Sequence, residues 1–275
     1  MLSPLRVSHG SAAESLKSNA SFRFTANCIF TAVTVLAQIE KLRSDGRKGV
    51  AILLDPDRVA LGDLTEHVRK IESHRPDFLF VGGSLITTGS FDEVLATVRQ
   101  ATSMPVVLFP GSVTQLSPHV DAVLFLSLIS GRNPELLIGQ HVVAAPRVKE
   151  LKLEAIPTGY LLIDGGRPTT ASYISNTQPI PANKAGIASA TALAGELLGM
   201  RCIYLDAGSG AANPVSAEMI RAVRESCSLP LIVGGGIRTR AQADIAYAAG
   251  ADLLVIGTAI EEEPSLIAEF LSPPR

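Results

Sequence analysis

The sequence predicts a (β/α)8 barrel, because eight short apolar runs alternate along it with segments of helical periodicity. The runs are rich in Val, Ile and Leu, and each ends in a polar or glycine-rich stretch. Continuous apolar runs of this kind are typical of parallel strands that are buried on both faces. Alternation of such strands with helices predicts a parallel sheet, and eight repeats favour its closure into a barrel. A doubly wound open sheet is the alternative.

The expected strands and helices follow one another from residue 49 onward. The strand segments are GVAILLDPD, DFLFVGGS, PVVLFPG, DAVLFLSLIS, GYLLIDGG, RCIYLDAGSG, PLIVGGGI and ADLLVIGTAI. The helical segments are LGDLTEHVRKIESH, FDEVLATVRQAT, NPELLIGQHVVAA, NKAGIASATALAGELLG, NPVSAEMIRAVRESC and TRAQADIAYAAG. Several helical segments open on Asn, Thr or Asp, which are preferred N-cap residues.

The third repeat is short, because only SVTQLSPHV separates the third strand from the fourth. This segment cannot form a full covering helix, so a loop is expected in its place. The strand surface left bare has two explanations that spacing does not separate. Either the N-terminal segment or another subunit covers it, or it forms a groove for an apolar ligand.

Composition limits the domain organisation and the class of partner. A chain of 275 residues with 47% hydrophobic residues suits a single barrel, which we expect over residues 28–275. Residues 1–27 are rich in Ser and Ala and predict a disordered tail. The net charge of −2, the 5% aromatic content and the absence of Trp argue against a nucleic-acid partner.

Two further features bear on location. CIFTAVTVLAQI is too short for a membrane span and lacks the features of a secretory signal, so it predicts a helix packed on the barrel. Cys28, Cys202 and Cys227 are odd in number, widely spaced and outside any CxxC motif. They are expected to be thiols in a reducing compartment, which favours a cytoplasmic protein.

Glycine-rich loops follow the last three expected strands. They are Gly208-Ser209-Gly210, Gly234-Gly235-Gly236 and Gly257-Thr258. Backbone N–H groups in such loops can approach phosphate oxygens, and the helix that follows adds its positive end. The usual phosphate site of the barrel lies after its seventh and eighth strands. These loops therefore predict a phosphate site, to which the Ser209 hydroxyl would donate.

Carboxylates stand beside this site and across from it. Asp55 ends the first strand and precedes Pro56, and Ser84 ends the second strand. Mg²⁺ prefers one or two carboxylates with waters and substrate phosphates, so Asp55 and Ser84 are candidate ligands. Asp206 opens the sixth loop and is the candidate base toward a substrate hydroxyl. The alternatives are a turn cap for Asp55 and a solvated acid or helix cap for Asp206. No His ends a strand, so none is assigned to catalysis.

A string of motifs carries a family resemblance. DPD, FVGGS, PTGYLLIDGG, SYISNTQPIP, YLDAGSGA, GGGIRT and GTAIEE, in this order, resemble the geranylgeranylglyceryl phosphate synthase family. The resemblance runs from about Gly49 to the C-terminus, and SGRNPELLIGQHVV is similar to the larger second group of that family. It implies a modified TIM barrel in which a short loop replaces the third helix. It implies a phosphoglycerol geranylgeranyltransferase, which moves a geranylgeranyl or similar polyprenyl group from its diphosphate to the 3-hydroxyl of sn-glycerol 1-phosphate. The product would be an ether phospholipid precursor.

The resemblance also implies site residues and partners. Mg²⁺ would be held by Asp55 and Ser84. Glycerol phosphate would bind on Tyr204, Leu205, Asp206, Ala207, Gly208, Ser209, Gly210, Gly234, Gly235, Gly236, Gly257 and Thr258. Many relatives carry Glu where this chain has Asp206, so the carboxylate that orients or deprotonates the hydroxyl is one methylene shorter here. A homo-oligomer and a peripheral membrane contact for product release are expected as well.

Two other functions remain open from the residues alone. One is another phosphate-binding barrel enzyme of sugar-phosphate metabolism, although no Lys ends a strand as an aldolase would need. The other is a non-catalytic lipid or phosphate carrier, which would keep the glycine-rich loops but would have no need of Asp55.

Overall fold

The structure is a computed structural model that describes residues 33–86 and 90–271. The predicted disordered tail, residues 1–27, lies outside the described residues, as does the start of the segment CIFTAVTVLAQI. The rest of that segment enters α1 (Val35–Ser44), so a helix is present where one was expected.

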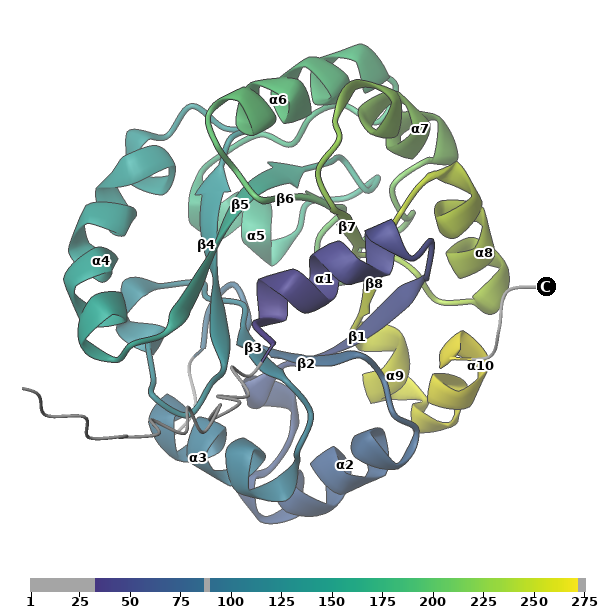
Figure 1. Ribbon diagram of the computed structural model, residues 1–275. Helices are drawn as coiled ribbons and strands as arrows, with labels where there is room; N and C mark the ends of the chain where they lie inside the picture. The colour runs from purple at the N-terminus through teal and green to yellow at the C-terminus, as the bar shows by residue number, and fades with distance from the viewer. Residues whose placement is uncertain (1–32, 87–89, 272–275) are drawn as a thin grey trace, which may run out of the picture. The chain divides into compact units, whose positions relative to one another are not determined.

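Eight parallel strands close into a barrel in chain order, from β1 through β8 and back to β1 (Figure 1). They are β1 (Gly49–Leu54), β2 (Phe78–Val81), β3 (Val106–Leu108), β4 (Ala122–Leu128), β5 (Glu154–Leu162), β6 (Cys202–Asp206), β7 (Leu231–Gly234) and β8 (Leu253–Ile256). Closure is direct, because Gly49 pairs with Leu253 and Ile52 pairs with Ile256. The barrel prediction is confirmed, and the open sheet is wrong.

Helices surround the strands. The α-helices after α1 are α2 (Leu61–Ser73), α3 (Phe91–Ala101), α4 (Gln140–Glu150), α5 (Thr170–Ser175), α6 (Ala185–Leu197), α7 (Ala217–Ser226), α8 (Arg240–Ala249), α9 (Thr258–Glu262) and α10 (Ile267–Leu271). Short helical turns are η1 (Pro56–Arg58), η2 (Val113–Gln115), η3 (Glu135–Gly139) and η4 (Pro264–Leu266). Within the described residues, none of these helices is long and apolar enough to cross a membrane.

The N-cap predictions are confirmed in part. Thr239 caps α8, accepting a hydrogen bond from the N–H of Gln242 in a capping box. The helix expected from Asn213 instead begins at Ala217, because Ser216 accepts from the N–H of Met219 and is the cap.

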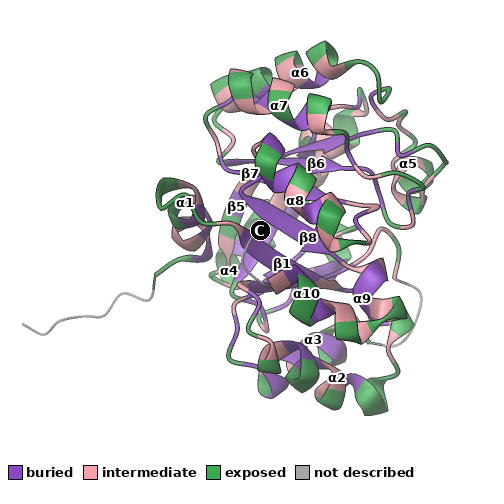
Figure 2. Cartoon of the chain, turned by 90° about the vertical axis from the view of Figure 1, so that its right-hand side faces the viewer, coloured by how far each residue is buried: buried purple, intermediate pink, exposed green. Residues whose placement is uncertain are grey.

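Side chains on the strands alternate between two apolar layers, as the two-residue period of a strand requires. The outer layer packs the strands against the helices and includes Ile52, Ile203 and Leu205. The inner layer fills the barrel and includes Phe80, Leu124 and Tyr204. Figure 2 shows buried strands surrounded by helices that are buried only on their inward faces.

Helix α1 closes one end of the barrel. Its buried residues Val35, Ile39 and Leu42 join the inner layer. The carboxylate of Glu154, at the start of β5, accepts from the N–H groups of Val35 at 2.7 Å and Leu36 at 2.9 Å. Because Glu154 begins its strand, α1 lies at the N-terminal ends of the strands, and Figure 2 shows α5 at the opposite end.

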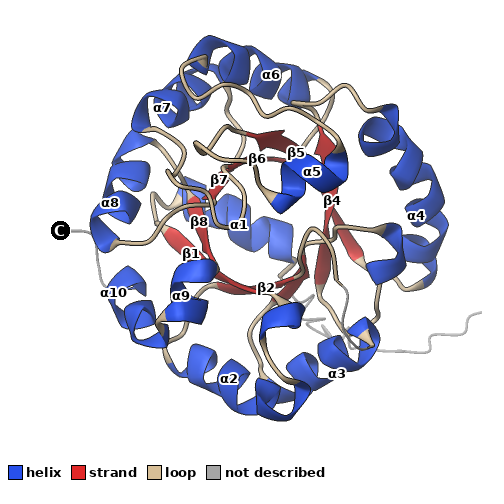
Figure 3. Cartoon of the chain, turned by 180° about the vertical axis from the view of Figure 1, so that it is seen from behind, coloured by secondary structure: helices blue, strands red, loops and turns tan. Residues whose placement is uncertain are grey.

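The third repeat lacks its α-helix, as predicted. Between β3 and β4 the chain forms only η2, and Figure 3 shows the strands from the end at which α5 and α9 lie. Strand β4 is contacted here by η3 and by His141 of α4, and η2 packs against α4.

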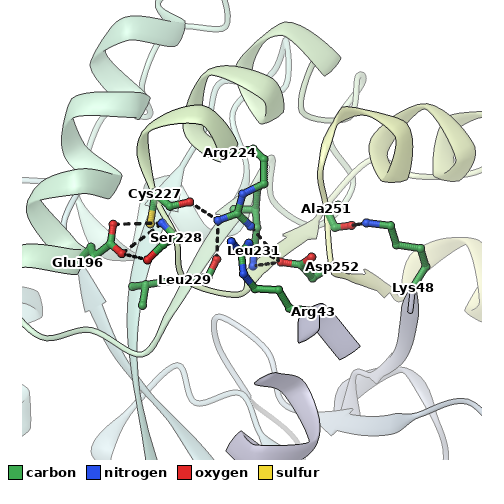
Figure 4. Close-up of polar contacts among 10 residues, drawn as sticks. All are labelled: Arg43, Lys48, Glu196, Arg224, Cys227, Ser228, Leu229, Leu231, Ala251 and Asp252. Atoms are coloured by element: carbon green, nitrogen blue, oxygen red, sulfur yellow. Dashed lines mark hydrogen bonds and ion pairs between the residues drawn. The ribbon is translucent and has the colours of Figure 1, made fainter. Parts of the chain in front are cut away.

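A buried aspartate fixes the closed end. Asp252 precedes β8, is 6% exposed, and accepts from Arg224 Nη1 at 3.1 Å and from the Leu231 N–H at 2.9 Å (Figure 4). Arg43 of α1 approaches the same carboxylate at 3.7 Å. One side chain thus joins α1, α7, β7 and β8.

Candidate active site

The loops after the strands build one cavity of about 510 Å³ at the C-terminal ends of the strands. Most of the predicted site residues line it. They are Asp55, Ser84, Tyr204, Asp206, Ser209, Gly210, Gly235, Gly236, Gly257 and Thr258. The predicted metal end and the predicted phosphate end therefore face the same space.

Four predicted residues do not line this cavity. Leu205 and Ala207 pack into the outer apolar layer, because alternation along β6 turns their side chains away from the barrel interior. Gly208 and Gly234 lie behind the wall, where Gly208 donates to Asp206 and Gly234 lies against the Tyr204 hydroxyl. Their part in substrate binding stays a prediction.

Asp206 is the most deeply buried acid of the cavity, at 6% exposure. Its Oδ2 accepts from the Tyr160 hydroxyl at 2.5 Å, and its Oδ1 accepts from the Gly208 N–H at 2.7 Å. Burial raises the pKa of Asp206, and the two hydrogen bonds offset part of that rise. Such a carboxyl binds a proton more readily than an exposed one, which suits proton transfer near neutral pH.

Tyr160 is a site residue that the sequence reasoning missed. It pairs in register with Tyr204 on the neighbouring strand, and both side chains line the cavity. Burial and the negative charge of Asp206 raise the pKa of both tyrosines well above the usual value, so both hydroxyls remain protonated donors. The sequence indicates this pair only by placing one Tyr in each of two consecutive strand segments, PTGYLLIDGG and RCIYLDAGSG.

Phe109 completes an aromatic group at the same place. Its ring stacks on Tyr204 at 5.3 Å between centroids and meets Tyr160 edge-on at 6.0 Å. Three rings held in mutual contact have little freedom to turn. They fix the direction in which the two tyrosine hydroxyls point.

The loop after β7 packs tightly on Asp206 through Gly235. A Cβ at this position would lie 2.5 Å from the Gly208 nitrogen and 2.6 Å from Asp206 Oδ1, and its φ is +78°. Only glycine satisfies both the close approach and the left-handed backbone. The loops after β6 and β8 also meet, since Ser209 Oγ lies 3.4 Å from Thr258 Oγ1.

After β1, beside the loop that follows β8, Asp55 both caps a turn and lines the cavity. Its Oδ1 accepts from the Asp57 N–H at 3.1 Å, and Arg58 Nε lies 3.5 Å from its Oδ2. The backbone of Gly83 approaches the same carboxylate, since a Cβ there would lie 3.4 Å from Oδ1. Burial is the main cause that raises the pKa of Asp55.

The donors at this rim fit a magnesium ion that is shared with a substrate. Asp55 supplies one partly desolvated carboxylate, and Ser84 supplies a hydroxyl from the next strand end. In residues 33–86 and 90–271, no group of three or more His, Cys, Asp or Glu side chains could hold a metal by itself. Mg²⁺ commonly takes one or two carboxylates and completes its shell with waters and phosphates, which this pair allows.

The remaining cavity wall is apolar and lies where the third helix is missing. Its side chains include Val113 and Leu116 near η2, Phe125 and Leu128 of β4, and Leu136 of η3. The bare strand surface was explained either as covered by the N-terminal segment or another subunit, or as a groove for an apolar ligand. The structure supports the groove, because this surface lines the cavity. Helix α1 does not cover it, because α1 lies at the closed end of the barrel.

His141 of α4 also faces this wall. Its Nε2 lies 3.1 Å from Ser127 Oγ, its ring meets Phe125 edge-on at 4.6 Å, and burial lowers its pKa. The sequence reasoning assigned no role to it. Leu136, Gln140 and Ala144 are four residues apart and so share one helix face, which lines the cavity together with His141. This spacing is the feature of the sequence that indicates the face.

Fold and site together define a TIM-barrel enzyme with a substrate cavity that combines polar strand-end loops with an apolar wall. The model of the PcrB family matches residues 44–272, and the chain belongs to that family. The resemblance to geranylgeranylglyceryl phosphate synthases is confirmed, and the protein is a prenyltransferase.

Individual relatives support this assignment. The chain is 53% identical to a geranylgeranylglyceryl phosphate synthase of Chitinophaga pinensis over 83% of this chain and 90% of that protein. It is 50% identical to one of Spirosoma linguale over 84% and 92%. Among solved structures, (S)-3-O-geranylgeranylglyceryl phosphate synthase from Thermoplasma acidophilum, in complex with its substrate sn-glycerol-1-phosphate, superposes with a TM-score of 0.80 at 33% identity. The match covers 86% of this chain and 97% of that one.

Proposed function

We propose that this protein transfers a geranylgeranyl or similar polyprenyl group from its diphosphate to the 3-hydroxyl of sn-glycerol 1-phosphate, with Mg²⁺ bound. The observation that carries the proposal is that one cavity joins Asp55 and Ser84, the apolar wall, and Asp206 with its glycine-rich loops. The relatives named geranylgeranylglyceryl phosphate synthase, and the solved relative that binds sn-glycerol-1-phosphate, support the same assignment.

The glycerol phosphate would lie on the loops after β6, β7 and β8. The backbone of Gly235 and Gly236 and the hydroxyls of Ser209 and Thr258 face the cavity there. A phosphate held by these groups would place the substrate hydroxyl near Asp206. Fixing the acceptor in this way supplies much of the rate acceleration, because a bound alcohol meets the donor carbon in a set geometry.

In the reaction, the allylic carbon–oxygen bond to the diphosphate breaks and an ether bond to the glycerol oxygen forms. The hydroxyl proton passes to the Asp206 carboxylate, whose raised pKa favours proton uptake. Tyr160 holds Oδ2 of that carboxylate through its hydroxyl, and the Gly208 N–H holds Oδ1, so the shorter side chain is fixed at both oxygens. Asp55 and Ser84 are the residues that would hold Mg²⁺, which supplies positive charge against the leaving diphosphate.

The prenyl chain would lie on the apolar wall formed by η2, β4, η3 and α4. Each buried methylene contributes about 0.8 kcal/mol, so a long chain gains much of its affinity there. A prenyl chain bound on this wall would exclude water from the reacting carbon and so protect an allylic cation from hydrolysis.

We also propose a homo-oligomer and a peripheral contact with the membrane for product release. Ile138 and Val142, 61% and 66% exposed, support a subunit contact on η3 and α4.

On α5, Tyr173 is 83% exposed and the neighbouring Ile174 lines the cavity, which supports release of an apolar product toward lipid. Analytical ultracentrifugation tests the first, and co-sedimentation with anionic vesicles tests the second.

A prenyl-transfer assay with labelled donors tests the function. We expect transfer to sn-glycerol 1-phosphate with Mg²⁺, loss of transfer in Asp55→Ala, and an unchanged circular dichroism spectrum in that variant. Donors from C15 to C35 would identify the preferred chain length. Binding of donor and acceptor without transfer would indicate a carrier, and turnover of sugar phosphates instead would indicate another phosphate-binding barrel enzyme.

A further inference from the structure

Arg58 lies at the rim of the cavity between two acidic side chains. Its Nε is 3.5 Å from Asp55 Oδ2, and its Nη1 is 3.0 Å from Glu261 Oε2. All three side chains line the cavity, with side-chain exposures of 45% for Arg58, 28% for Asp55 and 12% for Glu261. When ionised, the three groups together carry one net negative charge.

Few basic residues face this space. In the part of the chain that the structure describes, Arg58 and Arg238 are the arginines of the cavity wall, and no lysine lies on it. Arg238 follows the glycine-rich loop after β7, at the end proposed for glycerol phosphate. Arg58 is therefore the basic side chain at the end of the cavity that holds Asp55 and Ser84.

We propose that Arg58 binds the diphosphate of the prenyl donor and that Glu261 is the positioning residue that holds its guanidinium at the rim. The inference rests on the proposed function and deepens it by naming residues that recognise the leaving group. A guanidinium presents a planar fork of N–H donors that matches phosphate oxygens bidentately. The contact to Glu261 occupies Nη1 and leaves other N–H groups to donate to a phosphate.

Asp55 and Arg58 are linked through a short rigid segment. They are three residues apart, and Pro56 begins η1 between them. A cation held by Asp55 shares the charge of its carboxylate and so weakens the attraction between Asp55 and Arg58. The guanidinium then remains held by Glu261 and is available to the diphosphate. In the absence of a diphosphate, Arg58 competes with a cation for Asp55.

Glu261 connects this rim to the neighbouring loop after β8. It lies on α9, whose first residue, Thr258, belongs to the loop after β8. Thr258 Oγ1 in turn lies 3.4 Å from Ser209 Oγ. The helix that anchors Arg58 thus begins in the loop proposed to bind glycerol phosphate, which fixes the spacing between the donor and acceptor phosphates.

Calorimetric titration with inorganic diphosphate and Mg²⁺ tests the binding role without turnover. We expect Arg58→Ala to weaken diphosphate binding about ten- to hundredfold, as loss of a charged hydrogen-bond donor does. Arg58→Lys keeps the charge but loses the fork, and should weaken binding less. Glu261→Gln should fall between wild type and Arg58→Ala. Arg147→Ala is the matched control, because Arg147 forms an i,i+3 ion pair with Glu150 on the exposed face of α4, away from the cavity residues, and it should bind like wild type.

Mn²⁺ binding without diphosphate, followed by electron paramagnetic resonance, provides a second readout with the opposite sign. Arg58→Ala removes the competitor at Asp55, so Mn²⁺ should bind more tightly than to wild type. A merely structural role for Arg58 would weaken both ligands together or neither.

Steady-state kinetics then locate the effect. In Arg58→Ala the KM for the prenyl diphosphate should rise at least about tenfold, whereas the KM for glycerol phosphate should stay within about twofold. A folded Arg58→Ala protein with unchanged diphosphate affinity and unchanged donor KM would overturn the inference. Failure of the proposed function would give a different result from failure of this inference. Wild-type protein would then transfer no prenyl group, whereas the diphosphate titration would still distinguish the variants.

Discussion

The Tyr160 hydroxyl donates to Asp206 Oδ2 at 2.5 Å, from the strand that pairs with β6. The bond joins the proposed base to the aromatic group formed by Phe109, Tyr160 and Tyr204. It lowers the pKa of Asp206 against the larger effect of burial, and it holds the carboxylate in position.

Tyr160→Phe removes this donor and should raise the pKa of Asp206 further. We expect the acidic limb of the kcat/KM profile to move to higher pH, and activity at neutral pH to fall about tenfold. A pH–rate profile measures both. Tyr247→Phe is the control, because the Tyr247 hydroxyl donates to the Gly49 carbonyl outside the cavity. A Tyr160→Phe profile identical to wild type would contradict the link to Asp206.

Asp206→Asn should abolish transfer and make the free energy of unfolding less dependent on pH. The pKa of Asp206 is raised in the folded protein, so the folded state binds the proton more tightly than the unfolded state does. The stability contributed by this group is therefore lost as pH rises from the unfolded value of 3.8 through the raised folded value. Thermal unfolding should show that the stability of Asp206→Asn, relative to wild type, is higher at pH 8 than at pH 5. An equal difference at both pH values would argue against an ionisable, buried Asp206.

Gly235→Ala should weaken glycerol phosphate binding and destabilise the protein by about 1–3 kcal/mol, because the new Cβ meets Gly208 and Asp206 at a positive φ. Isothermal titration and urea unfolding measure the two effects. Gly186→Ala on α6 is the matched control, since no atom lies within 4 Å of its added Cβ. It should be neutral or stabilising by about 0.5–1 kcal/mol. Equal effects of the two substitutions would contradict the explanation by close approach and positive φ at Gly235.

Asp252→Ala should destabilise the protein by about 3 kcal/mol, because it leaves Arg224 and the Leu231 N–H without their buried partner. Urea unfolding gives the free energy. The KM values of the folded fraction should remain those of wild type, since Asp252 lies at the closed end of the barrel. A change in KM would show that the two ends are coupled.

The sequence sufficed for the barrel, because each strand is a continuous apolar run and each strand end carries its own polar loop. It also located Asp55, Ser84 and Asp206, since residues that follow parallel strands must gather at one end. The short segment between β3 and β4 revealed the missing helix by length alone.

What the sequence did not reveal depends on register and side-chain direction. Leu205 is among the residues expected to bind glycerol phosphate, although the alternation of side chains along β6 places it in the outer layer. Tyr160 became a site residue only through its pairing with Tyr204 across β5 and β6. Arg58 looks in the sequence like a solvated charge, and only its position between Asp55 and Glu261 shows otherwise.

Helix α1 packs across the N-terminal ends of the strands, and the cavity described above lies at their C-terminal ends. Under the proposed function, donor and acceptor would both enter from that end, and the product would leave along the path by which its prenyl chain entered. Turnover would then depend on the rate of product release, and product that stays bound would block binding of the next donor.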